Sequence, residues 1–217
     1  MSIRIILADD HTIVRDGLSE LLRRESDMEV IAYADNGFAA VRLAKELQPD
    51  VVIMDVAMPD LNGIEATHQI TRDCPNVKVV ALSMYSGRRF VSEMLRAGAA
   101  GYLLKDCAFN ELAAAIRVVV AGKAYLSPSI SQVLVENYVR NAPQQTNSVW
   151  SALTTREREV LQMLAEGRTT KQIAKLMHIS PKTVETHRLK LMGKLKMDSI
   201  ARLTKYAVQE GLTLPEP

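Results

Sequence analysis

Five polar side chains that could take part in chemistry each come directly after a run of apolar residues. They are Asp9, Asp10, Asp55, Ser83 and Lys105. Three carboxylates brought together repel one another and raise one another's pKa unless a cation joins them. Oxygen donors in small number favour Mg²⁺, which keeps several of its own waters. The residue types therefore indicate a magnesium site that also holds one hydroxyl and one ammonium group.

Such a site can carry out phosphoryl transfer. A carboxylate beside Mg²⁺ can attack phosphorus and become an aspartyl phosphate. Asp55 ends the apolar run "VVIM" and a turn follows at once in "AMPDLNG", so we expect Asp55 to be the acceptor. Lys105 would neutralise the phosphoryl oxygens together with the metal, and Ser83 would donate a hydrogen bond to them. Taken singly, each residue also has a structural explanation as a helix cap, a turn residue or a solvated charge.

The apolar runs are typical of strands and alternate with helix-like segments between residues 3 and 121. Strands are expected at 3–8, 28–34, 51–54, 77–83 and 100–105, and helices at about 12–24, 37–47, 63–72, 87–97 and 108–121. This alternation predicts an α/β fold, a flavodoxin-like five-stranded parallel sheet with helices on both faces. Ligands bind such sheets at the carboxyl ends of the strands, which is where the five polar residues fall.

The alternation stops after Gly122. One more helix is expected in "LSPSISQVLVENYVR", and the polar "NAPQQTNSVW" is typical of a linker. From Leu153 onwards all the signals are helical. We therefore expect an α/β domain over residues 1–121, a linker with a helix over 122–150, and a small all-α domain over 151–217.

The all-α domain contains the pattern of a helix-turn-helix at about residues 170–189. "LTTREREVLQMLAEG" begins with Thr154 and Glu157, which form a capping-box signature. A short helix in "TTKQIAKLM" and the tight turn "HIS" follow, and Ser180 and Pro181 begin the helix "PKTVETHRLKLMGKL". Two short helices joined in this way predict binding of double-stranded DNA, with the second helix as the recognition helix.

The recognition helix has two different faces. Val184, Leu191 and Leu195 recur on one face and are expected to pack inward. On the other face, a glutamate can accept from cytosine, and the methyl groups of Thr and Leu can touch thymine. The surrounding cations are better placed for phosphates, which position a protein without specifying sequence. The expected DNA contacts are Lys171, Lys182, Thr183, Glu185, Thr186, Arg188, Leu189, Lys190 and Lys194.

Composition and charge agree with two domains that have different partners. The chain of 217 residues is 47% hydrophobic and 24% charged, as in ordinary soluble proteins. Residues 1–127 carry a net charge of −3 and residues 128–217 a net charge of +5. The two cysteines, Cys74 and Cys107, have no CxxC spacing, so neither a disulfide framework nor a zinc cluster is expected. With no signal peptide and no membrane-length apolar run, we expect a cytoplasmic protein without a membrane partner.

Two sets of motifs resemble known families. "ADD", "DVAMPDLNG", "ALS" and "GYLLK" together are similar to the receiver domain of bacterial response regulators. "GRTTKQIAKLMHISPKTVETHRLKLMGKL" closely resembles the LuxR-type DNA-binding domain. In that order, the two domains resemble a response regulator of the NarL type. The resemblance implies a transcriptional regulator that a histidine kinase phosphorylates, that binds promoter DNA as a homodimer when active, and that is not a turnover enzyme.

The same resemblance assigns roles to residues of the first domain. Asp55 would be the phosphoacceptor, and Asp10 and Asp55 would bind Mg²⁺, with Asp9 in support and the Ala57 carbonyl as a further ligand. The resemblance also implies three further roles: Ser83 as the switch hydroxyl, Lys105 as the phosphate partner and Tyr102 as the switch aromatic.

Two other functions remain open at this point. A phosphatase or phosphotransferase can also form an aspartyl phosphate, but it commonly carries a second acid two residues after the nucleophile, where this chain has Ala57. A DNA-binding regulator with a vestigial receiver is the other alternative. The complete set of five polar residues at the predicted edge argues against it.

Overall fold

The computed structural model describes residues 2–106, 108–132, 135 and 152–213. Contacts between residues divide the chain into two compact units, an N-terminal α/β unit and a C-terminal helical unit. Residues 133, 134 and 136–140 of the predicted helix at 126–140, and all of the predicted linker at 141–150, lie outside the described residues. Residues 128–132 and 135 of that stretch are helical.

Strands and helices alternate along the N-terminal unit, as the sequence predicts. Its elements are β1 (Ile3–Ala8), α1 (Thr12–Arg23), β2 (Met28–Ala34), α2 (Gly37–Leu47), β3 (Val51–Asp55), α3 (Gly63–Asp73), β4 (Lys78–Ser83), α4 (Arg88–Arg96), β5 (Gly101–Leu104), α5 (Ala108–Val120) and β6 (Tyr125–Leu126). Asn36 and Asn62 cap α2 and α3, because each side chain accepts a hydrogen bond from a backbone N–H of the first turn.

The strands form one parallel sheet in the order β2-β1-β3-β4-β5-β6. The predicted parallel α/β fold is confirmed, with a sixth strand that we did not expect. β6 is only two residues long and is held by its backbone, since the N–H groups of Tyr125 and Ser127 donate to the carbonyls of Ala100 and Tyr102 at 3.0 and 3.1 Å. Side-chain alternation cannot show in so short a strand.

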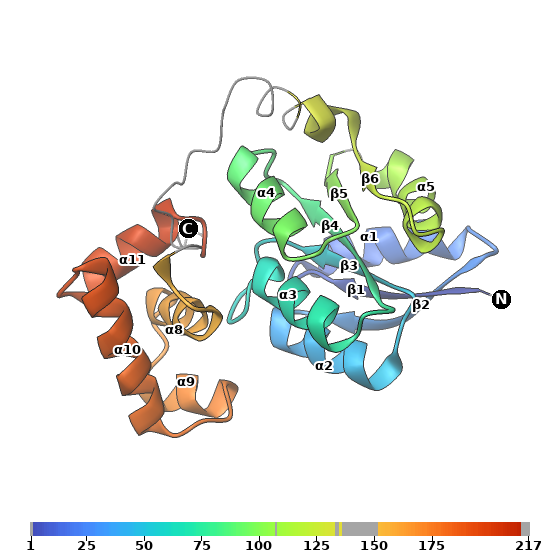
Figure 1. Cartoon of the computed structure of the whole chain (residues 1–217). Coiled ribbons are helices and arrows are strands. Elements are labelled where there is room, and N and C mark those ends of the chain that lie inside the picture. Colours follow the sequence, from blue (N-terminus) through green and yellow to red (C-terminus); the bar gives the residue numbers. More distant parts are fainter. Residues whose placement is uncertain (1, 107, 133–134, 136–151, 214–217) are drawn as a thin grey trace. The chain divides into compact units, whose positions relative to one another are not determined.

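Helices cover both faces of the sheet (Figure 1). α1 contacts α5 on one face, and α3 contacts both α2 and α4 on the other. The residues of β1, β3, β4 and β5 are mostly apolar and buried, as expected for a parallel sheet covered on both sides, whereas β2 at the edge is only partly buried. This rigid core fixes the strand ends, and with them the loops that carry the polar residues.

The C-terminal unit contains α8 (Thr155–Ala165), α9 (Thr170–Leu176), α10 (Pro181–Leu195) and α11 (Ile200–Gln209). The predicted capping box of Thr154 and Glu157 is present, and Ser180 caps α10 with a proline in its first turn. Thr169 and Gln172 form a second capping box, at the start of α9. α8 packs on α10 and α11, and α9 packs on α10. Within the described part of the chain, no helix has the length and apolar character needed to cross a membrane.

Candidate functional site

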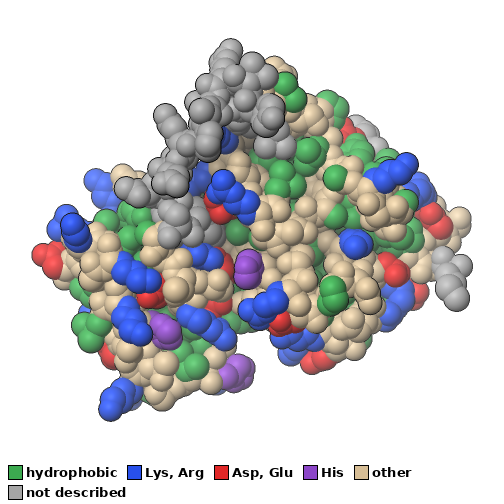
Figure 2. Space-filling model, in the orientation of Figure 1, with side chains coloured by type: hydrophobic (Ala, Val, Ile, Leu, Met, Phe, Trp, Pro, Cys, Tyr) green, Lys and Arg blue, Asp and Glu red, His purple; other side chains and the backbone are tan. Residues whose placement is uncertain are grey.

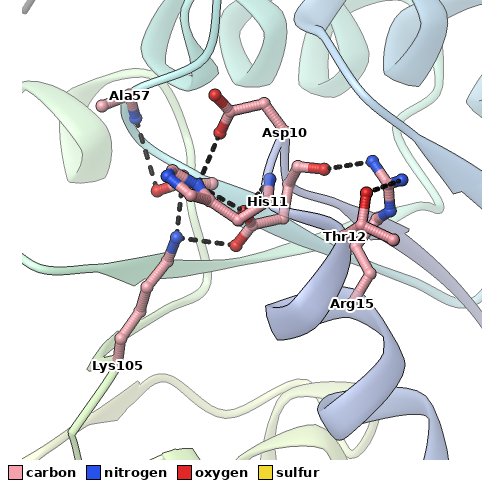
Figure 3. A network of polar contacts seen from close by, with 8 residues as sticks. Asp10, His11, Thr12, Arg15, Ala57 and Lys105 are labelled. Carbon is pink, nitrogen blue, oxygen red and sulfur yellow. Dashed lines mark hydrogen bonds and ion pairs between the residues drawn. The ribbon is translucent and has the colours of Figure 1, made fainter.

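The carboxyl edge of the sheet gathers the five polar side chains. Asp9 and Asp10 follow β1, Asp55 ends β3, Ser83 ends β4, and Lys105 follows β5. The Lys105 ammonium lies 2.7 Å from Asp9 Oδ2 and 2.9 Å from Asp55 Oδ2, and dashed lines lead from Lys105 to its partners in Figure 3. Ligand atoms of Asp9, Asp10 and Asp55, together with one of His11, all lie within 4.8 Å of one another. The structure therefore brings the predicted acids and the predicted ammonium group into one cluster.

The electrostatics of this cluster depend on burial. Asp55 is only 4% exposed, and this burial raises the pKa of its carboxyl group to about 6. The charge of Lys105 opposes the rise, whereas the charge of Asp9 adds to it. Burial on its own would lower the pKa of Lys105, but Asp55 and Asp9 together outweigh burial and raise it. The cluster thus holds an excess of carboxylates that one ammonium group only partly neutralises.

The loop after β1 orients its two aspartates through His11. The backbone N–H of His11 donates to Asp9 Oδ1 at 2.9 Å, and the ring Nδ1 lies 2.9 Å from Asp10 Oδ1. Arg15 on α1 donates to the Asp9 carbonyl at 2.6 Å and to Thr12 Oγ1 at 3.3 Å (Figure 3). The roles of His11 and Arg15 were not predicted. The position of His11 directly after two aspartates was the only sequence signal for its role.

A close backbone approach shapes the loop after β3. The Gly63 N–H donates to the Val56 carbonyl at 3.0 Å, so the start of α3 lies directly on the end of β3. A Cβ at position 63 would collide with the carbonyl oxygen of Asp55, which explains the glycine in "DLNG". The Ala57 N–H lies 3.4 Å from Asp55 Oδ1, and the Ala57 side chain is a methyl group without acid chemistry.

Ser83 and Tyr102 are connected through the backbone of Tyr85. The Tyr85 N–H donates to Ser83 Oγ at 3.0 Å, and the Tyr102 hydroxyl donates to the Tyr85 carbonyl at 2.7 Å. Ser83 and Tyr102 are both fully buried. Burial raises the pKa of Tyr102 to about 12; a hydrogen bond with Ser83 opposes the rise, and the charge of Asp55 adds to it. A change in the hydrogen bonding of the Ser83 hydroxyl can therefore alter the hydrogen bond of Tyr102.

The donor set fits a magnesium ion. The three carboxylates supply oxygen ligands at one solvent-facing edge, and Asp10 is exposed while Asp9 and Asp55 are buried. The excess of negative charge beyond what Lys105 neutralises is the second property that favours a divalent cation there.

The predicted recognition helix, α10, has one buried and one exposed face. Val184 and Leu191 are fully buried, and Leu195 is half-buried. Most of the predicted DNA contacts are exposed: Lys171, Lys182, Thr183, Thr186, Leu189, Lys190 and Lys194. On the face shown in Figure 2, Lys and Arg side chains gather over the C-terminal unit. The surface thus offers positive charge around the exposed side of one helix.

Two of the predicted DNA contacts, Glu185 and Lys194, bind side chains on other helices of the C-terminal unit. Glu185 accepts a hydrogen bond from Thr170 Oγ1 at 2.8 Å and lies 3.6 Å from Arg188. Lys194 donates to Glu157 at 2.6 Å and so ties α10 to the beginning of α8. Spacing along one helix could not show the contacts with Thr170 and Glu157, because these two residues lie on other helices.

Comparison with known proteins decides the family. Residues 5–117 match the response regulator receiver domain, and residues 151–207 match the bacterial regulatory proteins of the luxR family. The chain is 38% identical over 210 residues to the response regulator GacA of Pseudomonas viridiflava, with 97% of each chain covered. It is also 38% identical over 213 residues to the oxygen regulatory protein NreC of Staphylococcus carnosus, with 96% of this chain and 98% of the relative covered. This chain belongs to the response regulators.

Solved structures of other response regulators extend the comparison. The response regulator ChrA of a heme-sensing two-component system is 33% identical, with a TM-score of 0.54 over 97% of this chain and 98% of ChrA. RcsB in complex with DNA is 27% identical, with a TM-score of 0.60 over 95% of this chain and 98% of RcsB. This response regulator thus combines a receiver domain with a LuxR-type DNA-binding domain, as in DNA-binding regulators of two-component systems.

Proposed function

We propose that this response regulator is a transcription factor controlled by phosphorylation of Asp55. The observation that supports the proposal most strongly is the contact of the Lys105 ammonium with both Asp9 and Asp55 at the carboxyl edge of the sheet. A carboxylate that ends a buried strand beside an ammonium group and two further acids can serve as a nucleophile toward phosphorus. The Ala57 methyl group cannot protonate a leaving group, which disfavours a phosphatase.

The phosphoryl donor would be the phosphohistidine of a histidine kinase. An oxygen of Asp55 forms the new bond to phosphorus, the phosphorus–nitrogen bond breaks, and its electron pair stays on the imidazole, which takes up a proton. Asp10, Asp55 and the Ala57 carbonyl would hold Mg²⁺, with Asp9 in support. The bound ion would supply positive charge for the phosphoryl oxygens. Lys105 would shift its contact from the carboxylate to the phosphoryl group.

The signal would leave the site through Ser83 and Tyr102. Ser83 Oγ now accepts from the Tyr85 N–H, and as a hydroxyl it can also donate to a phosphoryl oxygen. Movement of Ser83 toward the phosphoryl group would strain its contact with Tyr85, whose carbonyl holds the Tyr102 hydroxyl. The two side chains would then shift together and change the surface of the receiver around α4 and β5.

The DNA-binding half of the proposal covers the C-terminal unit. We infer a receiver over residues 1–121, a linker over 122–150 and a DNA-binding domain over 151–217, with α10 entering the major groove. Exposed lysines around α10 would contact phosphates, and the side chains at its centre would contact bases. One short helix reads only a half-site, so the active form would be a homodimer. RcsB dimers bound to DNA give a precedent among the relatives.

The test compares DNA binding of the wild type and Asp55→Asn before and after treatment with acetyl phosphate and Mg²⁺. A duplex selected from a random library by the phosphorylated protein serves as the probe, and a scrambled duplex is the control. We expect the treatment to raise the affinity of the wild type for the selected duplex and to leave Asp55→Asn unchanged. Equal increases in both proteins, or no preference for the selected duplex, would refute the proposal.

A further inference from the structure

The recognition helix presents a large apolar side chain to solvent at its centre. Leu189 is 69% exposed, whereas Val184 and Leu191 of the same helix are fully buried. Leu189 therefore adds little to the packing of the C-terminal unit. Thr186, one helical turn before it, is also exposed, and residues three apart lie on the same helix face.

Thr186 contributes its methyl group to this surface. Its hydroxyl donates to the Lys182 carbonyl at 3.0 Å, within the same helix. This hydrogen bond uses the one proton of the hydroxyl, so the hydroxyl can accept but not donate elsewhere, and the methyl group is the apolar part of this exposed side chain. Leu189 and Thr186 thus form an exposed apolar step, here called the apolar step of α10.

The acid next to this step is engaged within the protein. Glu185 accepts from Thr170 of α9 at 2.8 Å and lies 3.6 Å from Arg188. The contact with Thr170 holds Oε1 of Glu185 toward α9, and Oε2 lies beside Arg188. The geometry therefore makes Glu185 a residue that positions the two helices, and the exposed side chains beside it, Thr186 and Leu189, are the stronger candidates for apolar base contact.

The charge around the apolar step identifies its occupant. Lys182 and Lys190 are exposed on the same helix, and neither forms an ion pair within the described part of the chain. A partner for this surface must therefore carry anions on both sides of an apolar group. In the major groove of DNA, the apolar group presented by the bases is the C5-methyl of thymine.

We propose that Leu189 and Thr186 recognise thymine methyl groups, so that each half-site of the target DNA carries thymine opposite the middle of α10. This inference rests on the proposed function, since it requires that α10 binds in the major groove. It adds the base class that this chain prefers and the residues that set the preference.

The experiment replaces thymine by uracil, which removes the C5-methyl group and changes nothing else on the base edge. The probe is the duplex selected from a random library, with uracil introduced at one thymine at a time. For the wild type, we expect at least one thymine in each half-site where uracil lowers the affinity roughly fourfold, the effect of losing one buried methyl group. At the thymine whose methyl group Leu189 contacts, Leu189→Ala should bind the thymine and uracil duplexes equally, whereas Leu189→Met should keep the preference.

Ile200→Ala is the matched control, because Ile200 is another exposed apolar residue of the C-terminal unit, on α11. It should keep the wild-type preference for thymine. The inference is overturned if uracil is tolerated at every position, if Leu189→Ala keeps the preference, or if Ile200→Ala loses it equally. In those outcomes the selected duplex is still preferred over a scrambled one, so the proposed function stands. Failure to select any sequence overturns both.

Discussion

Replacing Asp55 by asparagine should stabilise the receiver in the absence of metal, and by more as the pH rises. Burial raises the pKa of Asp55 from 3.8 to about 6. Each pKa unit corresponds to about 1.4 kcal/mol, so holding the ionised carboxylate in this site costs about 3 kcal/mol. Asparagine keeps the shape of the side chain and carries no charge.

The pH range over which the variant gains stability follows from the pKa of Asp55 in the unfolded chain and its pKa in the folded protein. Below about pH 4 the carboxyl group is protonated in both the folded and the unfolded chain, and its full contribution to stability is present. As the pH rises toward 6, the unfolded chain ionises first, so this contribution is lost. Above the folded pKa the wild type lacks about 3 kcal/mol that Asp55→Asn retains. The gain of the variant should therefore develop between pH 4 and about 7.

Hydrogen exchange of β3 and β4 amides measures this effect in the full-length protein, because those amides report the unfolding of the receiver alone. Wild type and variant are compared at the same pH, so that the intrinsic exchange rate of each amide cancels. EDTA is present to keep metal out of the site. Adding Mg²⁺ at pH 8 should narrow the gap, since the ion binds the carboxylate and not the amide. Asp16→Asn is the control, because Asp16 is exposed on α1 and lies outside the cluster. A gain that stays constant from pH 4 to pH 8 would refute the electrostatic argument.

Four further variants test other parts of the structure. Lys105→Ala should still bind Mg²⁺ but lose the increase in DNA affinity on phosphorylation, which is typically about 5- to 150-fold; a normal increase in a DNA titration would contradict the role of Lys105. Gly63→Ala should lower the free energy of unfolding, measured by chemical denaturation, by about 1–3 kcal/mol, because its Cβ collides with the Asp55 carbonyl. Gly193→Ala should instead raise the free energy of unfolding by up to about 1 kcal/mol, because its Cβ has open space around it in α10. Lys190→Ala should weaken binding to all duplexes and reduce the slope of log affinity against log salt by about one charge; an unchanged slope would exclude a phosphate contact.

The sequence predicted the elements that place the acids, because each depends on a local pattern. The runs that became β1, β2 and β3 are mostly apolar, with one charged residue each in β1 (Arg4) and β2 (Glu29), and proline or polar residues flank them. The edge cluster followed from topology alone, since parallel strands bring their carboxyl ends together. β6 was missed because a two-residue strand is defined by backbone hydrogen bonds to Ala100 and Tyr102, which leave no pattern in its own residues.

The parts of the sites that could not be predicted depend on contacts between elements. The Thr170–Glu185 contact joins α9 to α10, and helix periodicity placed Glu185 on the exposed face without showing that partner. The contact of the His11 ring with Asp10 depends on how the loop after β1 turns. The need for glycine at position 63 appears only when the start of α3 is seen against the end of β3. In each case the decisive neighbour comes from outside the segment that carries the motif.

The most direct test of the central claim is to locate the phosphoryl group after incubation of the full-length protein with acetyl phosphate and Mg²⁺. Intact mass measurement gives the number of phosphoryl groups, and peptide mapping gives their position. We predict one phosphoryl group on the peptide that contains Asp55, and none in Asp55→Asn or when EDTA removes the metal. Phosphorylation of Asp55→Asn to the wild-type level, or mapping to Asp9 or Asp10, would contradict the account.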